Sequence, residues 1–207
     1  MATPARTGNA NGAREPKQAR SKATRQRLLD AAVDELVAAG YANLTTSSVA
    51  ERAGVSRGAQ QHHFPQKATL VAEAVSHLAR RQIEQIQQTA ARASVRGRAE
   101  TILDLLYDLY SGPLFVAMLE LTLAARNEPE LAQLVTPIDR EVGRDLLTHG
   151  PALFGPEAAA HPDFDLRLRH ILATIRGLAL PRIHDRRRRA SQWRFTRAEL
   201  VALLGRP

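Results

Sequence analysis

Apolar residues recur along most of the chain at the three- and four-residue spacing of amphipathic helices. Glycine and proline interrupt this spacing at intervals, and no run shows the strict alternation that predicts a strand. The pattern therefore predicts an all-α protein. The expected helices cover residues 21–40, 49–53, 56–64, 66–90, 96–110, 113–126, 129–150, 164–180 and 196–204, and residues 151–163 are expected to form a loop.

The first three expected helices have recognisable ends. Ser21 is expected to cap the first helix and Gly40 to end it, while a hydroxyl cluster at residues 45–48 precedes the second. Ser56 is expected to cap the third helix, which stops at Pro65 because proline cannot extend a helix. Two short helices joined by a glycine-containing turn predict a helix-turn-helix.

The composition excludes several classes of protein. With 207 residues, of which 44% are hydrophobic, the chain can bury a core. Cysteine is absent, which excludes disulfide frameworks, thiolate catalysis and cysteine zinc sites. The longest apolar run, residues 114–119, is far shorter than the roughly 20 residues that cross a bilayer, and the first twenty residues lack the apolar core of a secretory signal. We therefore expect a soluble, cytoplasmic protein with no membrane association.

The net charge of +8 is concentrated in two segments. Residues 1–27 hold seven Arg or Lys and one Glu, and residues 182–197 hold seven Arg and one Asp, so the rest of the chain is acidic. Such basic segments indicate a polyanionic partner. The run Arg186–Arg189 is expected to be a solvated link before the last helix, with nucleic-acid contact as the weaker alternative, and Trp193 and Phe195 are expected to pack against the bundle.

The helix after the turn carries polar side chains suited to reading DNA. In a helix-turn-helix this second helix enters the major groove and its first turn reaches the base edges. Val55 and Phe64 are expected to dock it on the other helices. The outer face is supplied by Arg57, Gln60, Gln61, His62 and His63.

Cations stand where they oppose helix dipoles, at a cost of roughly 0.3–1 kcal/mol each. Arg57 and Lys67 fall in the first turns of their helices, and Lys22 and Arg25 lie near the start of the first. Phosphates docked at these helix starts would make the same cations favourable. Adjacent histidines on a helix point about 100° apart and have no acidic neighbour here, so we expect no metal site.

The sequence Ala53-Gly54-Val55-Ser56-Arg57-Gly58, followed by His-His-Phe-Pro-x-Lys ending at Lys67, resembles the DNA-binding domain of TetR-family transcriptional regulators. The resemblance covers roughly residues 21–70. It implies an N-terminal three-helix helix-turn-helix domain followed by a helical-bundle ligand-binding and dimerisation domain. On this basis residues 1–20 would be a disordered basic arm, 21–68 the DNA-binding domain and 69–207 the second domain.

The resemblance assigns phosphate contacts to hydroxyl, histidine and lysine positions, and base or backbone contacts in the groove to Arg57 and Ala59. The chain departs from the family at Gln60 and Gln61, where an apolar residue and a tyrosine are common. These glutamines either pack or read bases, and glutamine at position 61 could read adenine. The predicted DNA-binding residues are Thr46, Ser47, Ser56, Arg57, Gly58, Ala59, Gln61, His62, His63 and Lys67. The basic arm resembles arms that follow the backbone or enter a minor groove, with a solvated tail as the equal alternative.

Family members enclose a mostly apolar effector pocket in the second domain. The expected lining here is Tyr107, Tyr110, Leu114, Phe115, Met118, Leu119 and Thr122, residues that would serve equally well as plain core. Glu120 and Arg126 are expected to face solvent or pair. Two apolar stripes resemble the family's dimer-interface helices, with an intramolecular core as the alternative: Leu134, Ile138, Val142 and Leu146, and Leu168, Ile171, Leu172, Ile175 and Ala179.

The sequence contains no Gly-rich phosphate loop, Gly-x-Ser-x-Gly elbow or Glu-x-x-His pair, so we expect no catalytic residues and no cofactor. The resemblance implies a homodimeric repressor that binds a palindromic operator in double-stranded DNA and is released by a small hydrophobic effector. Two alternatives are a ligand-independent architectural DNA-binding protein and a helical protein-interaction module.

Overall fold

The computed structural model describes residues 14–94, 96–180 and 189–205. Within these ranges the chain is helical and contains no strand, which confirms the predicted all-α fold. The elements are α1 (Arg14–Asn43), α2 (Thr46–Arg52), α3 (Arg57–His63), α4 (Lys67–Arg92), α5 (Arg98–Ser111), α6 (Pro113–Ala125), α7 (Pro129–Phe154), α8 (Pro156–Ala159), α9 (Phe164–Ala179) and α10 (Arg189–Gly205).

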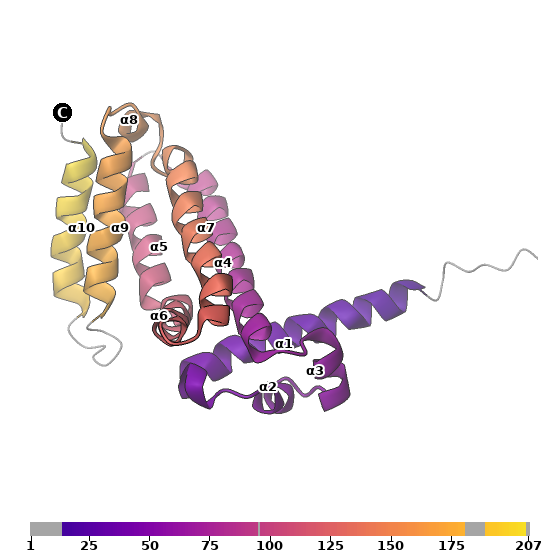
Figure 1. Ribbon diagram of the computed structural model, residues 1–207. Coiled ribbons are helices and arrows are strands. Elements are labelled where there is room, and N and C mark those ends of the chain that lie inside the picture. Colours follow the sequence, from indigo (N-terminus) through magenta and orange to yellow (C-terminus); the bar gives the residue numbers. More distant parts are fainter. Residues whose placement is uncertain (1–13, 95, 181–188, 206–207) are drawn as a thin grey trace, which may run out of the picture.

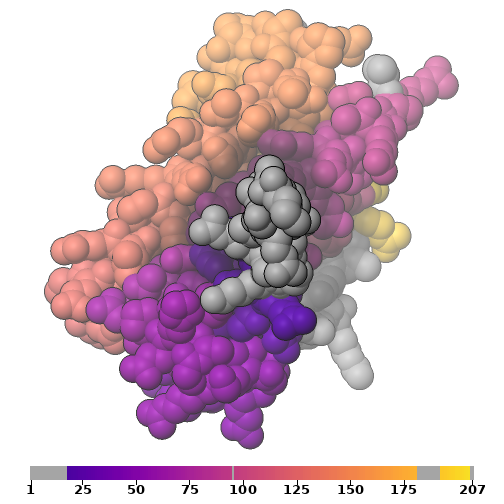
Figure 2. Space-filling view, turned by 90° about the vertical axis from the view of Figure 1, so that its right-hand side faces the viewer, coloured from indigo at the N-terminus to yellow at the C-terminus, as the bar shows by residue number. Residues whose placement is uncertain are grey.

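The helices form a small unit at one end and a longer bundle above it (Figure 1). Helices α1, α2 and α3 make the small unit, and α4 leads from it into the bundle. Helix α4 packs on both α1 and α7, and α6 packs on α1. The side view in Figure 2 shows the same order, with the purple N-terminal helices below and the orange α7 to α9 region above them.

One hydrophobic core runs through both parts. Leu28 and Leu36 of α1 pack in the same cluster as Phe64, as Leu70 of α4 and as Leu106 of α5. All five side chains are at most 1% exposed. The position of the small unit is therefore set by buried apolar contact with the bundle as well as by the continuous chain at α4.

The first helix begins earlier than predicted. Helix α1 starts at Arg14, so Ser21 lies inside it and does not cap it, and residues 14–20 are helical instead of part of an arm. The residues there are mostly strong helix formers, and Pro16 falls in the first turn, where proline is tolerated. Lys22 and Arg25 consequently lie away from the first turn, and the dipole argument does not apply to them. The arm's residues 1–13 lie outside the described part.

The C-terminal boundaries also differ. Residues 151–163 are not one loop, because α7 continues through Pro151 to Phe154 and α8 follows. A proline in the last turn removes a single helical hydrogen bond, and Gly155, at φ 94°, ends the helix instead. Helix α10 starts at Arg189, well before residue 196. The arginines at 186–188 lie outside the described residues.

The two aromatic residues of α10 have opposite environments. Trp193 is buried, stacks on Tyr107 with ring centroids 4.1 Å apart and donates a hydrogen bond to Asp104 Oδ1 at 2.7 Å, which confirms the predicted packing. Phe195 is 70% exposed, so the same prediction is wrong for it. Trp193 and Phe195 are two positions apart, and residues two positions apart on a helix point to different sides of it.

No single described helix has the length and apolarity needed to cross a membrane. Helices α5 and α6, with a bend of 47° between them, have that length and apolarity only when they are taken together, and this is a statement about length and composition alone.

Candidate nucleic-acid interface and effector cavity

Helix α2 begins with a reciprocal cap. Thr45 Oγ1 accepts a hydrogen bond from the backbone N–H of Ser48 at 3.0 Å, and Ser48 Oγ accepts one from the N–H of Thr45 at 3.2 Å. This capping box satisfies two backbone donors that would otherwise have no partner. Val49 and Ala50 are buried on the inner side, so Ser47 is presented outward.

The turn between α2 and α3 depends on glycine at one position. Gly54 has φ 60°, in the left-handed region that side chains with a Cβ rarely adopt. The N–H of Val55 donates a hydrogen bond to the carbonyl oxygen of Ala50 at 2.9 Å, which closes the turn. Ser56 then caps α3, its Oγ accepting from the N–H of Ala59 at 3.3 Å, as the sequence predicts.

Helix α3 is fixed by its buried side. Phe64 is 1% exposed and the Arg25 guanidinium lies 5.3 Å from its ring centroid. Gln60 is 3% exposed and its Nε2 donates to the carbonyl oxygen of Phe64 at 2.6 Å. Gln60 therefore packs where the family commonly has an apolar residue, and it satisfies its amide locally. Gln61 is exposed, so the two glutamines have different environments.

The ten predicted DNA-binding residues lie together on α2, α3 and the start of α4. Six are exposed and four are half-buried, so none is hidden from solvent. The exposed ones are Ser47, Ser56, Arg57, Gly58, Gln61 and His62, and the half-buried ones are Thr46, Ala59, His63 and Lys67. Arg57 is the first residue of α3 and Lys67 the first of α4, which confirms the predicted cations at these two helix starts.

The cations around this surface differ in their partners. Arg25 forms an ion pair with Glu73, whereas exposed Lys22 and Arg57 form none with the residues that the structure describes. Burial, with the nearby charges of His62 and Arg25, lowers the pKa of His63 below its usual value. No described group of three or more His, Asp or Glu side chains is placed to hold a metal ion.

Lys67 lies at the junction where the N-terminal helix-turn-helix unit meets the bundle. Its Nζ lies 4.2 Å from the centroid of the Tyr41 ring, and burial lowers its pKa although the charge of Glu128 opposes that shift. Tyr41 in turn donates its hydroxyl to Glu128 Oε2 at 3.1 Å. Burial, reinforced by this hydrogen bond and the Glu128 charge, raises the pKa of Tyr41 to about 12.

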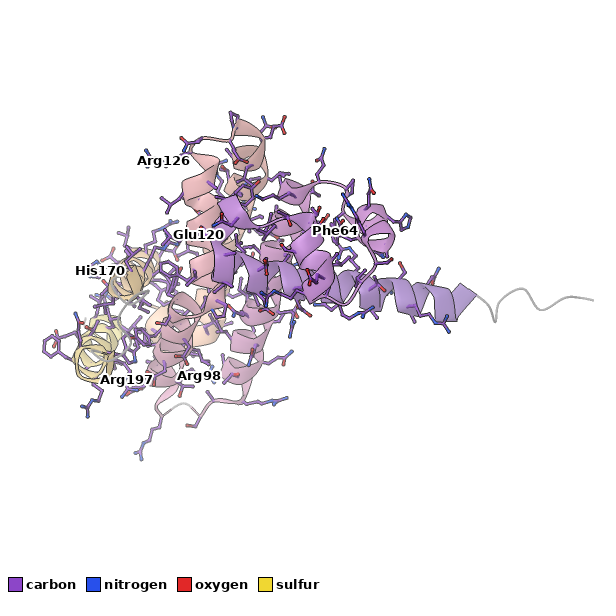
Figure 3. The ribbon with its side chains drawn as sticks, turned by 90° about the horizontal axis from the view of Figure 1, so that it is seen from below. Phe64, Arg98, Glu120, Arg126, His170 and Arg197 are labelled. Atoms are coloured by element: carbon purple, nitrogen blue, oxygen red, sulfur yellow. The ribbon has the colours of Figure 1, made fainter. Side chains whose placement is uncertain are left out.

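Glu120 joins the same junction from α6. Its Oε2 accepts from the backbone N–H of Tyr41 at 3.3 Å, and Figure 3 shows the side chain beside the N-terminal helices. Gly40, at φ 73°, leaves space there, since a Cβ on it would lie 3.0 Å from Glu120 Oε2. Glu120 thus pairs with a backbone N–H, which is one of the two outcomes that the sequence predicts, and it connects α6 to the end of α1.

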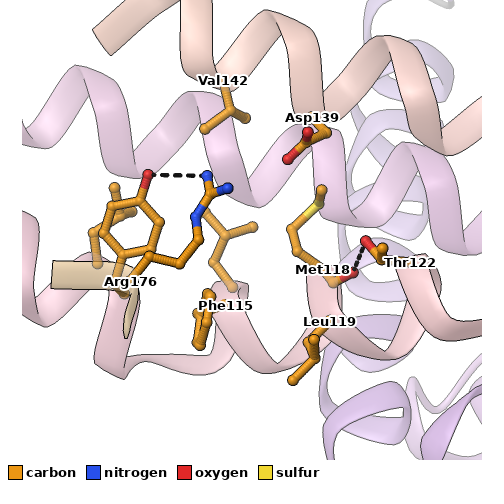
Figure 4. A pocket seen from close by; sticks show the side chains of 10 residues that line it. Phe115, Met118, Leu119, Thr122, Asp139, Val142 and Arg176 are labelled. Carbon is orange, nitrogen blue, oxygen red and sulfur yellow. Dashed lines mark hydrogen bonds between the residues drawn. The ribbon is translucent and has the colours of Figure 1, made fainter. Parts of the chain in front are cut away.

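A cavity of about 210 Å³ lies among α5, α6, α7 and α9 (Figure 4). Its lining is mostly apolar, with Asp139 and Arg176 as the charged members. Arg176 Nη2 donates to the Tyr110 hydroxyl at 3.4 Å. The lining residues are Leu109, Tyr110, Leu114, Phe115, Met118, Leu119, Thr122, Asp139, Val142 and Arg176.

Most of the predicted effector residues surround this cavity. Tyr110, Leu114, Phe115, Met118, Leu119 and Thr122 line it, whereas Tyr107 does not, because it stacks on Trp193. The sequence pattern missed Leu109, Asp139, Val142 and Arg176 as members of the lining. The two charged residues gave no signal, since in a helical pattern a charge marks the outer face.

The comparisons with known proteins agree with this arrangement. Residues 28–74 match the model of the family described as bacterial regulatory proteins, tetR family. The chain is 31% identical over 175 residues to the HTH-type transcriptional regulator CymR of Pseudomonas putida, covering 81% of this chain and 83% of that protein. The chain belongs to the TetR family. Family members are transcriptional regulators, so the protein is a DNA-binding transcriptional regulator and not an enzyme.

Solved structures share the TetR fold. A TetR-family regulator from Mesorhizobium loti superposes with a TM-score of 0.70 at 20% identity, covering 89% of this chain and 96% of that one. FadR from Bacillus subtilis, solved in complex with stearoyl-CoA, gives 0.61 at 21% identity, covering 87% and 98%. At these identities the likeness shows the fold alone.

Seven of the nine residues predicted to form the TetR dimer interface are buried within the chain, while Leu134 is 37% exposed and Val142 lines the cavity. The five named residues of α9 are all buried, and so are Ile138 and Leu146 of α7. They form this chain's own core, so the interface prediction is wrong for them, and the alternative of an intramolecular core is correct. The α9 residues are Leu168, Ile171, Leu172, Ile175 and Ala179.

Proposed function

We propose that the protein is a homodimeric repressor that binds a palindromic operator and is released by a small effector in the bundle cavity. The observation that carries the proposal is the exposed polar and cationic face of α3, held on a capped turn over a buried Phe64. DNA binding belongs to the unit of residues 21–68, and effector binding and dimerisation to residues 69–207. The protein acts in the cytoplasm, on double-stranded DNA.

In this proposal Arg57 and Gln61 read base edges, because both are exposed and both have the donors that major-groove recognition uses. Ala59 and Gly58 allow close approach to the duplex. The remaining residues, Thr46, Ser47, Ser56, His62, His63 and Lys67, contact the phosphate backbone. Lys67 reaches a phosphate from its place above Tyr41, so DNA contact and the junction with the bundle share one side chain.

A dimer supplies the second recognition helix. Two helices that read successive major grooves must lie about 34 Å apart, which one copy of α3 cannot provide. The outward faces of α9 and α10, which lie side by side in Figure 1, support an isologous interface. Leu166 is 66% exposed, Leu180 46% and Phe195 70%, in a region where Gly177 permits close helix approach.

Effector binding is proposed to act through α6. The cavity lies on α6 through Leu114, Phe115 and Met118, and the same helix holds the end of α1 through Glu120. An occupant that moves α6 therefore also moves Tyr41 and the cation above it. This path supports release of DNA by a cavity ligand.

Selection of bound sequences from random duplexes, with light scattering of the complex, tests the proposal. We expect a palindromic sequence bound by two chains. Inserting about 5 base pairs between its half-sites turns one of them to the other side of the duplex and should abolish tight binding. Recovery of no preferred sequence would favour an architectural DNA-binding protein, and binding that tolerates the insertion would contradict the dimer.

A further inference from the structure

A basic groove of about 600 Å³ lies beside the cavity, between α7 and α9. Arg140 and Arg144 come from α7, and Arg169 and Arg176 from α9. The groove has no acidic residue in its described lining, and none of the four guanidinium groups forms an ion pair within 4.0 Å among the described residues. The groove lining therefore carries four positive charges and no negative one, and the charge of Asp139 in the adjoining cavity acts on Arg176 alone among the four.

This clustering works against the stability of the fold. Arg140 and Arg144 are four residues apart on one helix, where like charges repel, and they face two more arginines across the groove. Elsewhere some arginines are paired, as Arg52 is with Glu35, and others, such as Arg57, are not, but none of these lies in a groove with three further arginines. A local rule broken in this way is typical of a functional site.

The groove adjoins the apolar cavity. Tyr110 and Arg176 line both, and the Arg176 guanidinium lies 5.4 Å from the Tyr110 ring centroid. Figure 4 shows Arg176 reaching toward the cavity beside Phe115 and Val142. The combined lining contains four arginines against one aspartate, Asp139. An apolar cavity thus lies beside a groove that suits several negative charges.

From this juxtaposition we infer that the effector is an amphipathic anion, with a small apolar body in the cavity and a multiply charged phosphate-ester head group in the groove. The inference rests on the proposed function and names the ligand class of that same site. The apolar body is small, because 210 Å³ exceeds the roughly 150 Å³ that holds benzene but falls below the roughly 300–1,000 Å³ of a drug-sized site.

The head group carries more than one charge. A single carboxylate is satisfied by one bidentate arginine, whereas four arginines on two facing walls match the several oxygens of a phosphate ester. The groove lies on α7 and α9 of the bundle, apart from the exposed face of α3, so operator DNA does not account for it (Figure 1).

The test is calorimetric titration of the full chain with hexyl diphosphate, and with its separate parts, pyrophosphate and 1-hexanol. Hexyl diphosphate should bind at least about tenfold more tightly than either part. Hexanoyl-coenzyme A in a parallel titration distinguishes a compact diphosphate head from an extended nucleotide head.

The double variant Arg140→Gln/Arg144→Gln should bind the preferred probe at least about tenfold more weakly and bind 1-hexanol unchanged. Arg92→Gln removes an exposed, unpaired arginine at the end of α4 and is the matched control, which should bind every probe as the parent does. A thermal melt of each variant establishes that it folds.

Binding of either amphiphile with this dependence on the groove supports the inference. Equal affinity for pyrophosphate and hexyl diphosphate, unchanged affinity in the double variant, or binding of neither amphiphile would overturn it. Operator binding without any ligand is measured separately. Absence of operator binding would count against the proposed function. A titration that fails while the operator still binds would count only against this ligand class.

Discussion

The proposed DNA-binding surface and the proposed effector cavity are assembled in opposite ways. The surface comes from one contiguous stretch, residues 46–67, in which caps and a glycine turn fix each side chain locally. The cavity draws on four helices, and its Tyr110 and Arg176 are 66 positions apart in sequence. A site made from local geometry is visible in a sequence, whereas a site made from packing becomes visible only when the helices are placed.

The largest effect should come from removing the buried anchor of α3. Phe64→Ala deletes a side chain that is 1% exposed and should lower the free energy of unfolding by about 3–5 kcal/mol. Urea unfolding measures this. The neighbouring exposed residue is the control, since Gln61→Ala should change stability by no more than about 0.5 kcal/mol. Equal losses in both variants would mean that α3 does not dock through Phe64.

Arg57→Ala should weaken operator binding by about 1–3 kcal/mol and relax the preference for one base pair, because the side chain is exposed and reads a base edge in our account. Affinities for the operator and for single-base variants measure both effects. Arg92→Ala, far along α4, should change neither. A uniform loss of affinity for all sequences would make Arg57 a phosphate contact instead.

The two adjacent glutamines sharpen the same comparison within one helix. Gln61→Ala should cost about 1 kcal/mol of operator affinity with little change in stability, because Gln61 is exposed. Gln60→Leu should leave operator affinity within about twofold and alter stability by less than about 1.5 kcal/mol, because the amide is buried and, among the described residues, bonds only to the Phe64 carbonyl. A reversed pattern in the binding assay would exchange their roles.

The smallest effect is a pH dependence of stability. Burial lowers the pKa of His63 and of His77 in the folded chain, below the usual 6.5 that applies when it is unfolded. Stability should therefore be unaffected above about pH 6.5 and fall as the pH drops below it, because the unfolded chain then binds more protons. Unfolding free energies at pH 7.5 and 5.5 measure the slope.

The matched substitution is at His77, whose Nε2 is buried without a hydrogen-bond partner among the described residues. His77→Gln should reduce the loss of stability at low pH, whereas His170→Gln, at an exposed position on α9, should not. An identical pH dependence of the unfolding free energy in the parent and both variants would show that these histidines do not cause the loss of stability.

What the sequence could predict follows the same division. The all-α fold, the Ser56 cap, the Gly54 turn and most of the cavity's apolar residues were predictable, because they depend on periodicity and on residues with special backbone geometry. The start of α1 was not, since strong helix formers continue past a residue that resembles a cap. The burial of the apolar stripe on α9 and the place of Arg176 in the groove depend on which helices pack together, and periodicity does not specify that.

The central claim is that the exposed face of α3 reads sequence in duplex DNA. The most direct test compares the affinity of the full chain for its selected operator with that for a scrambled duplex of the same composition, at two salt concentrations. We predict tight binding of the operator at both concentrations and at least about a thousandfold preference over the scrambled duplex. Equal affinity for both duplexes, falling steeply with salt, would show binding through phosphates alone and contradict the account.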